Sequence, residues 1–128
     1  MVELAKFHKD VTIRKIVLVS VCGWWEMGNF DTVLRIVQEI AKDVDCEFAG
    51  AVLRPHAYLM RKKSEKTKKV IDALKQVGSE LVNSGVMPKD LLEIICQPLI
   101  SEEEYRRDLT MGYLKSRENN TLGLGVKF

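Results

Sequence analysis

Two periods alternate in the hydrophobic pattern of this chain, one typical of buried strands and the other of helices. Ile16–Val21 is an apolar run in which only Ser20 is polar. A continuous run of this kind predicts a strand over Thr12–Val21 that is buried on both faces, as in a parallel sheet. Glu47–Leu53 is a second short run, and we expect its strand to stop at the Arg-Pro pair that follows, because proline donates no backbone hydrogen bond.

Apolar residues between the two runs recur at three- and four-residue steps, which is typical of an amphipathic helix. They are Phe30, Val33, Leu34, Val37, Ile40, Ala41 and Val44. Asn29 is the expected N-cap of this helix, which should end near Asp43. Strand, helix and strand in this order form a βαβ unit, so we expect a parallel pair joined by a right-handed crossover.

The second half of the chain predicts three further helices. Arg61–Lys69 is a charge run that we expect to be a solvated loop before the first of them, which should end at Gly85 in the left-handed conformation. Pro88 is expected to occupy the first position of the next helix, which should stop before Pro98. Ser101 begins a capping box for the last helix.

Two glycines and the two chain ends give further expectations. Gly50 is expected to pack closely against a helix, and Gly78 to let its own helix approach the sheet. Met1–Asp10 shows no clear period and is expected to be loosely ordered. Asn119–Phe128 is expected to be either a frayed tail or an added edge strand.

The length of 128 residues fits one domain, residues 1–128, with an ordinary core. The 20 basic and 18 acidic residues give a net charge of +2, so charge gives no argument for nucleic-acid binding. No apolar run approaches the roughly 18 residues that a membrane span needs. Without a signal peptide or CxxC spacing among three cysteines, a reduced cytoplasmic setting is expected.

The two predicted strands are too few for a usual doubly wound sheet of about five strands. The first strand is apolar on both faces, so a further strand should lie along its other side. We therefore expect another chain to complete the sheet. That chain is either a second copy, giving a homo-oligomer, or a separate partner.

The segments that follow the two predicted strands carry the candidate chemistry, because α/β proteins bind ligands at the carboxyl ends of their strands. The distinctive residues of these segments are Cys22-Gly23, Trp25, Glu26, Phe30, Ala49-Gly50 and Leu53-Arg54-Pro55-His56. Together with Gly85 and the proline-started helix, they resemble the C-terminal half of the NADPH-dependent FMN reductase family, which has a flavodoxin-like fold. The resemblance runs from about Thr12 to Tyr113.

By this resemblance the fold is a partial flavodoxin-like doubly wound parallel sheet, with a βαβ unit and C-terminal helices. The two strands correspond to the fourth and fifth strands of the family. This sequence departs from the family because it lacks the first strand, with its Ser/Thr/Asn/Gly-rich loop for the flavin phosphate, and the third-strand segment. The missing neighbour would then be the third strand, carried by a second copy or by a separate N-terminal-half protein.

The resemblance implies an FMN site along the loop after the first strand. The residues implied are Ser20, Cys22, Gly23, Trp24, Trp25 and Glu26. Backbone amides would donate to the isoalloxazine ring and one tryptophan would stack on it. Alternatively, the tryptophans cover the strand end or a dimer contact, Cys22 is a small buried residue rather than a reactive thiol, and Glu26 caps the helix rather than orienting nicotinamide.

Arg54 and His56 are expected substrate-binding residues, which would meet a phosphate or carboxylate. The alternative is a structural Arg-Pro turn beside a solvated histidine. Arg61–Lys69 would attract the extra phosphate of NADPH or an acidic partner, or be only a solvated loop. The histidines and cysteines lack metal-ligand spacing, so no metal site is expected.

Two functions follow from these expectations. The first is a flavodoxin-like NAD(P)H-dependent FMN reductase half-domain, an oxidoreductase whose FMN site is complete only with a partner or second subunit. The second is a non-catalytic assembly module that pairs through its exposed strand and binds no flavin. Both predict that the protein is not a stable monomer.

Overall fold

The computed structural model describes residues 10, 12–118, 121–122 and 126–127. It contains two compact units, Met1–Gln97 and Pro98–Phe128. The elements of the first unit are β1 (Lys15–Val21), the 3₁₀ turn η1 (Met27–Phe30), α1 (Asp31–Asp43), β2 (Glu47–Arg54), the 3₁₀ turn η2 (Ala57–Arg61), α2 (Glu65–Ser84) and α3 (Lys89–Cys96). Those of the second unit are α4 (Glu102–Glu118), β3 (Thr121–Leu122) and β4 (Val126–Lys127).

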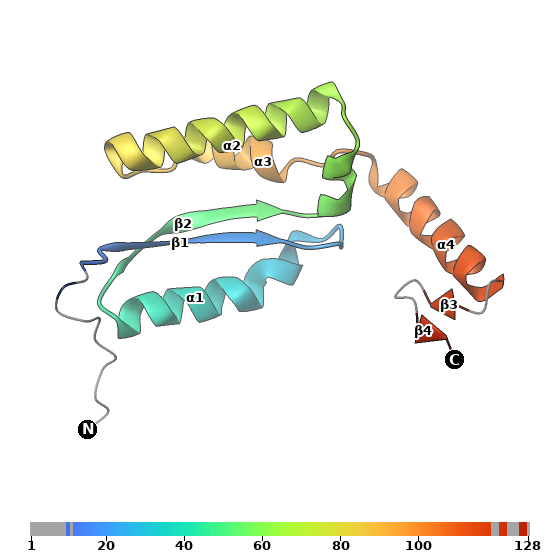
Figure 1. Cartoon of the computed structure of the whole chain (residues 1–128), viewed down its shortest axis with the longest axis horizontal. Helices are drawn as coiled ribbons and strands as arrows, with labels where there is room; N and C mark the ends of the chain where they lie inside the picture. Colours follow the sequence, from blue (N-terminus) through green and yellow to red (C-terminus); the bar gives the residue numbers. More distant parts are fainter. Residues whose placement is uncertain (1–9, 11, 119–120, 123–125, 128) are drawn as a thin grey trace. The chain divides into compact units, whose positions relative to one another are not determined.

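The first unit is a βαβ unit with helices on both sides of a small sheet. β1 and β2 pair in parallel, from Lys15 opposite Glu47 to Val21 opposite Arg54. α1 lies on one face of the pair, and α2 and α3 lie on the other (Figure 1). The described residues therefore form an α/β protein with a small open parallel sheet and four α-helices, which confirms the predicted fold class at this level.

β1 begins three residues later than predicted, at Lys15 instead of Thr12. Pairing with β2 limits its start, because the first opposed residues are Lys15 and Glu47, and Glu47 N–H already donates to the Arg14 carbonyl at 2.9 Å. The predicted end at Val21 is confirmed. β2 extends one residue beyond the predicted end and stops before Pro55, as its missing donor requires.

Gly50 packs closely, as predicted, but its neighbour is a side chain of the α2–α3 connection. The register shifts so that Ile16 opposes Phe48 and Val17 opposes Gly50, which leaves Ala49 as an extra residue on β2. Gly50 has φ 133°, and a Cβ added there would lie 2.6 Å from Met87 Cε. A glycine is required here because its backbone conformation is one that side chains rarely adopt.

The start of α1 differs from the prediction that Asn29 is its N-cap. The chain first makes the η1 turn, and Phe30 occupies the N-cap position of α1. The Asn29 side chain donates through Nδ2 to the Glu26 carbonyl at 2.8 Å, so it closes the turn instead of accepting from the helix. The predicted end at Asp43 is confirmed.

α2 begins inside the charge run that was predicted to be a loop. Ser64 is its N-cap: the Thr67 N–H donates to Ser64 Oγ at 3.2 Å, and the Ser64 N–H donates to Thr67 Oγ1 at 2.9 Å. The second half of Arg61–Lys69 is therefore helical, although its lysines are exposed. At the other end Gly85 has φ 75°, which confirms the left-handed helix end.

The sequence predicted how α3 and α4 begin. Pro88 is the N-cap of α3 instead of its first residue, and α3 ends at Cys96 before Pro98. Ser101 Oγ accepts from the Glu104 N–H at 3.1 Å, which confirms the capping interaction that opens α4.

Of the end segments, 1–9, 119–120, 123–125 and 128 lie outside the described residues; β3 and β4 pair antiparallel with each other.

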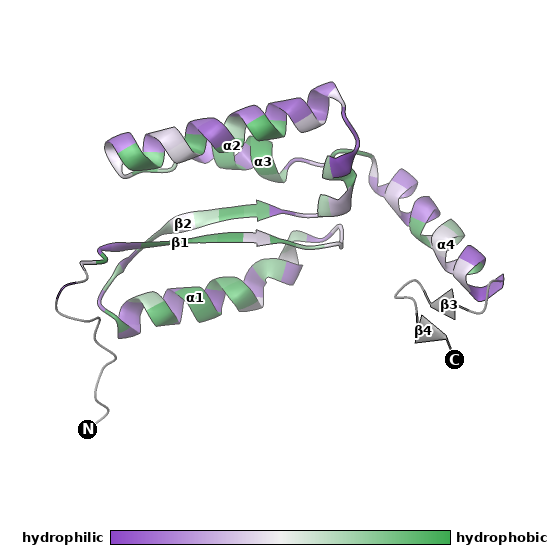
Figure 2. Ribbon diagram, viewed as in Figure 1, coloured by the Kyte–Doolittle hydropathy of each residue, from purple (hydrophilic) through white to green (hydrophobic). Residues whose placement is uncertain are grey.

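The side chains of β1 are less buried than its apolar run predicts. Both strands are mainly hydrophobic (Figure 2), yet Val19 is 70% exposed and Val21 is 65% exposed. These two residues oppose Val52 and Arg54, which are buried on the face that α3 covers. α3 thus covers the β2 half of this face and leaves the β1 half open.

Replacing Gly50 by alanine should destabilise the protein by about 1–3 kcal/mol, because an alanine would be held at a strained positive φ. Gly112→Ala is the matched control, since Gly112 lies in α4 with nothing within 4 Å of an added Cβ. That change should stabilise by up to about 1 kcal/mol. Urea unfolding measures the free energy of unfolding of both variants. Equal effects of the two changes would contradict the strained backbone conformation at Gly50.

Candidate functional site

Backbone hydrogen bonds join the segments that follow β1 and β2. The Cys22 N–H donates to the Arg54 carbonyl at 3.1 Å, and the Ala57 N–H donates to the Cys22 carbonyl at 3.0 Å. The His56 N–H donates to the Trp24 carbonyl, also at 3.0 Å. The structure therefore brings together the two loops that the sequence placed at one edge of the sheet.

Arg54 is the centre of this edge, and its buried side chain contacts three groups of the protein. Its Nη1 donates to the Ile95 carbonyl of α3 at 2.5 Å, and its Nε donates to the Pro55 carbonyl at 2.8 Å. Its Nη2 lies 3.0 Å from His56 Nε2. Because a guanidinium only donates, His56 Nε2 accepts and the neutral ring carries its proton on Nδ1.

His56 is buried, with 0% of its surface exposed, so the predicted alternative of a solvated histidine is wrong. It adopts a left-handed conformation at φ 37°, and its ring stacks on Trp25 with the centroids 4.8 Å apart and the planes inclined by 14°. Burial, and then the charge of Arg54, lower the pKa of His56 from 6.5 to about 4. At neutral pH the ring is uncharged beside a charged guanidinium.

The electrostatics of Arg54 follow from the same burial. Burial lowers the pKa of the guanidinium, and the nearby Cys96 and Cys22 act in the opposite direction. Arg54 thus ties β2 to α3 and to the loop after β1, which favours the structural interpretation of the Arg-Pro turn. Contact of Arg54 or His56 with a ligand stays a prediction, and it would require these side chains to leave their present partners.

The two tryptophans have different environments. Trp25 is half-buried against His56, whereas Trp24 is 59% exposed. Cys22 is half-buried with Sγ 3.5 Å from the Trp24 carbonyl. Of the tryptophans predicted to stack on a flavin ring, Trp24 presents an exposed ring and Trp25 already stacks on a side chain.

The remaining predicted residues of the loop lie around these two. A Cβ added at Gly23 would meet nothing within 4 Å, so the backbone is open to approach there. Ser20 is half-buried within β1. Glu26 is exposed at the N-cap of η1, but its side chain makes no capping hydrogen bond, so the predicted alternative that it caps a helix is wrong.

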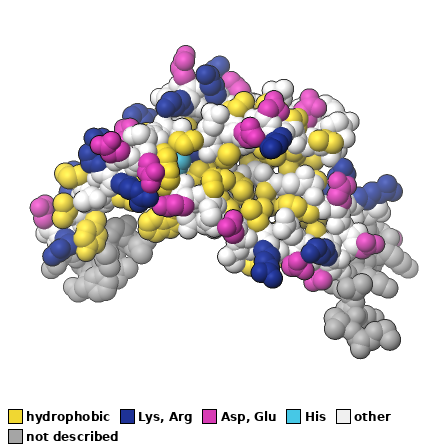
Figure 3. All heavy atoms as spheres, turned by 180° about the vertical axis from the view of Figure 1, so that it is seen from behind, with side chains coloured by type: hydrophobic (Ala, Val, Ile, Leu, Met, Phe, Trp, Pro, Cys, Tyr) yellow, Lys and Arg dark blue, Asp and Glu magenta, His cyan; other side chains and the backbone are white. Residues whose placement is uncertain are grey.

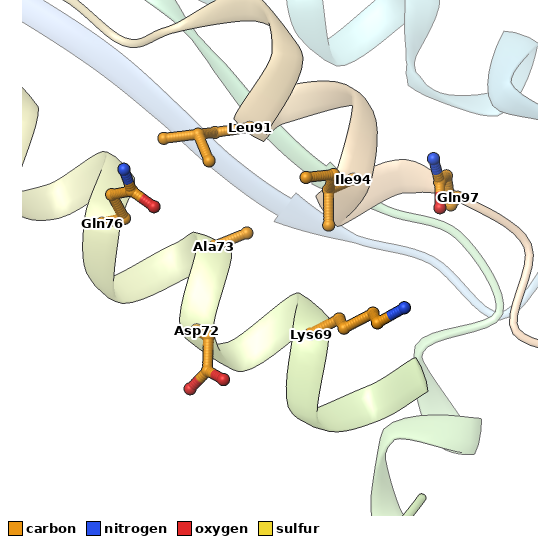
Figure 4. A pocket seen from close by; sticks show the side chains of 7 residues that line it. All are labelled: Lys69, Asp72, Ala73, Gln76, Leu91, Ile94 and Gln97. Carbon is orange, nitrogen blue, oxygen red and sulfur yellow. The ribbon is translucent and has the colours of Figure 1, made fainter. Parts of the chain in front are cut away.

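A cavity of about 430 Å³ lies between α2 and α3, and of the candidate residues that the sequence singled out only Lys69, the last residue of the charge run, lines it (Figure 4). Ala73, Leu91 and Ile94 supply apolar side chains, and four polar residues surround them: Lys69, Asp72, Gln76 and Gln97. The sequence did not predict this cavity, because it depends on how two helices pack together. The Ile95 carbonyl that receives Arg54 was also missed, because a contact across 41 residues leaves no local signal.

The described residues show neither a metal-binding cluster nor a membrane-spanning helix. Within the part of the chain that the structure describes, no three His, Cys, Asp or Glu side chains gather where they would share a metal ion. Over the same described residues, none of the helices is both long enough and apolar enough to cross a bilayer. Neither observation adds a candidate site.

Comparisons with protein-family models, with curated proteins and with solved structures find no match to this chain.

The buried histidine predicts an acid-sensitive stability. Between pH 6.5 and 4 the unfolded chain protonates His56 while the folded chain keeps it neutral, so stability is present above pH 6.5 and is lost as pH falls. At pH 4 the expected loss from this group is about 3 kcal/mol. Urea unfolding over this pH range measures it.

The matched control is His56→Asn, since asparagine tolerates the left-handed conformation and its side-chain oxygen accepts from Arg54. The variant should be less stable at neutral pH and should lack this part of the acid dependence. Two curves of stability against pH that run parallel from pH 6.5 to 4 would show that His56 is not held neutral.

Proposed function

We propose that this chain is a half-domain that acts by association, with another chain completing its parallel sheet along the open edge of β1. The observation that carries the proposal is the exposure of Val19 and Val21 on a strand that pairs only with β2 among the described residues. An open strand edge beside exposed apolar side chains is a template for pairing with another chain. If the added strand runs parallel to β1, the completed fold would in finer terms be flavodoxin-like.

Exposed apolar side chains extend beyond β1. α1 exposes Ile36 and Ile40, and α2 exposes Ile71, Leu74 and Val82. Hydrophobic side chains also gather across the middle of the face shown in Figure 3. Burying such surface contributes roughly 25 cal/mol per Å², so a partner that covers both the strand and its helices would be held firmly.

Val19→Lys should weaken the association, because it places a charge on the sheet face where the partner would pack against the apolar side chains of β1. The expected result is a shift of the mass measured by light scattering toward the 14.6 kDa of one chain, while the unmodified protein is larger. The fold should persist, since Val19 is already exposed within a single chain.

Met111→Lys is the control for that experiment, because it also replaces an exposed apolar side chain by lysine, but on α4. Its mass should equal that of the unmodified protein. An unmodified protein that remains a monodisperse monomer at high micromolar concentration would refute the proposal.

A second candidate is the NAD(P)H-dependent FMN reductase activity that the resemblance implies. The observation that favours it is Trp24, whose exposed ring stands directly after β1, at the carboxyl end where parallel sheets bind ligands. FMN would stack on Trp24, and the partner would supply the phosphate-binding loop. The protein's contribution would be to orient the ring, while the flavin supplies the redox chemistry.

Quenching of FMN fluorescence tests this candidate. Trp24→Ala should weaken FMN binding by about tenfold, or 1.4 kcal/mol, through loss of the stack. Tyr113→Ala, which removes an exposed aromatic ring from α4, is the control and should leave binding unchanged. If the associated protein leaves FMN fluorescence unquenched, the flavin candidate is rejected and association alone remains.

A further inference from the structure

The exposed apolar surface of the first unit includes one line of residues along α2, which we name the α2 stripe: Ile71, Leu74, Gly78 and Val82. Their spacing of three and four residues places them on one side of the helix. Their apolar side chains are exposed, Val82 by 85%. A Cβ added at Gly78 would meet nothing within 4 Å, so the prediction that Gly78 approaches the sheet is wrong, and the stripe has a gap at its centre.

The α2 stripe and β1 lie at the same height along the sheet. Lys15 Nζ donates to the Gly85 carbonyl at 2.8 Å, which ties the start of β1 to the end of α2, and the two elements run in opposite directions (Figure 1). Gly78 precedes Gly85 by about 10 Å along the helix. Leu18, the middle residue of β1, follows Lys15 by about 10 Å along the strand. The centres of the two surfaces therefore lie at about the same level along the sheet.

We infer that the chain completing the sheet is a second copy of this one, related by a two-fold axis that passes beside Leu18 and Gly78. The inference rests on the proposed function and names its partner. A two-fold interface brings the same patch of both subunits together, so it requires a surface that complements itself when reversed. The α2 stripe meets this requirement, since Leu74 and Val82 stand four residues on either side of Gly78.

The two β1 strands would pair antiparallel around this axis. Leu18 would lie opposite Leu18 of the partner subunit, and Val17 opposite Val19 of the partner subunit. Cross-strand pairs of β-branched residues stabilise such a ladder. The charged residue of β1, Lys15, would lie opposite an apolar residue, and it already contacts Glu47 at 3.4 Å. No like charges would therefore be opposed along the strands.

The two α2 helices would also run antiparallel across the axis. Leu74 would pack against Val82 of the partner subunit, and the absence of a side chain at Gly78 would let the backbones come close at the crossing. This arrangement gives the exposed glycine a packing role that the single chain does not provide.

A head-to-tail assembly, in which β1 pairs with β2 of the next copy, fits the structure less well. β2 carries the extra residue Ala49 and the positive φ of Gly50, and bulges of this kind protect strand edges from further pairing. β1 is regular over all seven residues. The edge of β1, which is the more exposed and the more regular of the two, is thus the one that would pair across a two-fold axis.

The orientation of the partner separates this inference from the flavin candidate. In an antiparallel pair the end of β1 lies beside the start of the partner's β1, so the partner presents no strand end next to Trp24. A flavin site shared between chains would instead need a parallel neighbour.

Disulfide cross-linking tests the two-fold arrangement in the full chain, with Cys22, Cys46 and Cys96 replaced by serine. Leu74→Cys and Val82→Cys are prepared separately and mixed before oxidation by oxidised glutathione, which accepts the two electrons and two protons that the thiols lose on forming the bond. The mixture should give at least about tenfold more covalent dimer than either variant alone, because only positions 74 and 82 come within disulfide distance. Ser79→Cys is the control and replaces either variant in the mixture. Ser79 lies about 100° from Gly78 around the helix, so its side chain points away from the proposed axis.

Each outcome of this experiment is informative. Cross-linking of Leu74→Cys with itself would mean either parallel helices or a two-fold axis beside residue 74, and either result would overturn the inference. A second result is a protein that associates, is dissociated by Val19→Lys and forms no 74–82 disulfide. That result would overturn the two-fold inference but leave the proposed function in place. Absence of association in both the parent and the variants would reject the proposed function itself.

Discussion

The open edge of β1 is the constraint on which the rest of this structure depends. A parallel pair of strands has few backbone hydrogen bonds of its own, and β1 carries an apolar sequence that suits burial on both faces. The chain covers the β2 half of the sheet with α3 and leaves Val19 and Val21 exposed. The same strand therefore limits how much apolar surface a single chain buries and carries the proposed association.

At the carboxyl ends of the strands the chain satisfies its polar groups internally. Arg54 donates to the carbonyl of Pro55, directly after β2, and to a carbonyl of α3. Its third contact fixes the tautomer of His56, which in turn stacks on Trp25. This network holds the loop after β1 in place through side chains as well as backbone. It leaves Trp24 as the exposed aromatic residue of that loop, and Trp24 is the residue that the proposed flavin stack would use.

Much of this architecture was predictable because its causes are local. Both strands follow from short apolar runs, α1 follows from its three- and four-residue period, and Gly85 marks the end of α2 through a conformation that glycine favours. The start of α2 was missed because lysines dominate the segment, although Ser64 and Thr67 formed a recognisable cap.

The candidate site was less predictable because its contacts are distant in sequence. The adjacency of the two loops follows from a parallel sheet, but the bond between Arg54 and Ile95 does not, and neither does the burial of His56 beneath a tryptophan that lies 31 positions away. Gly78 illustrates the opposite error: a glycine in a helix suggested close packing, yet its neighbours within one chain leave it open.

The most direct measurement of the central claim is backbone hydrogen exchange of Lys15–Val21 as a function of protein concentration. If another strand completes the sheet, the amides of β1 that point away from β2 should become protected as concentration rises, while amides within α4 stay unchanged. Rapid exchange of those β1 amides at every concentration would contradict the account, because it would show that the edge of β1 remains open to water.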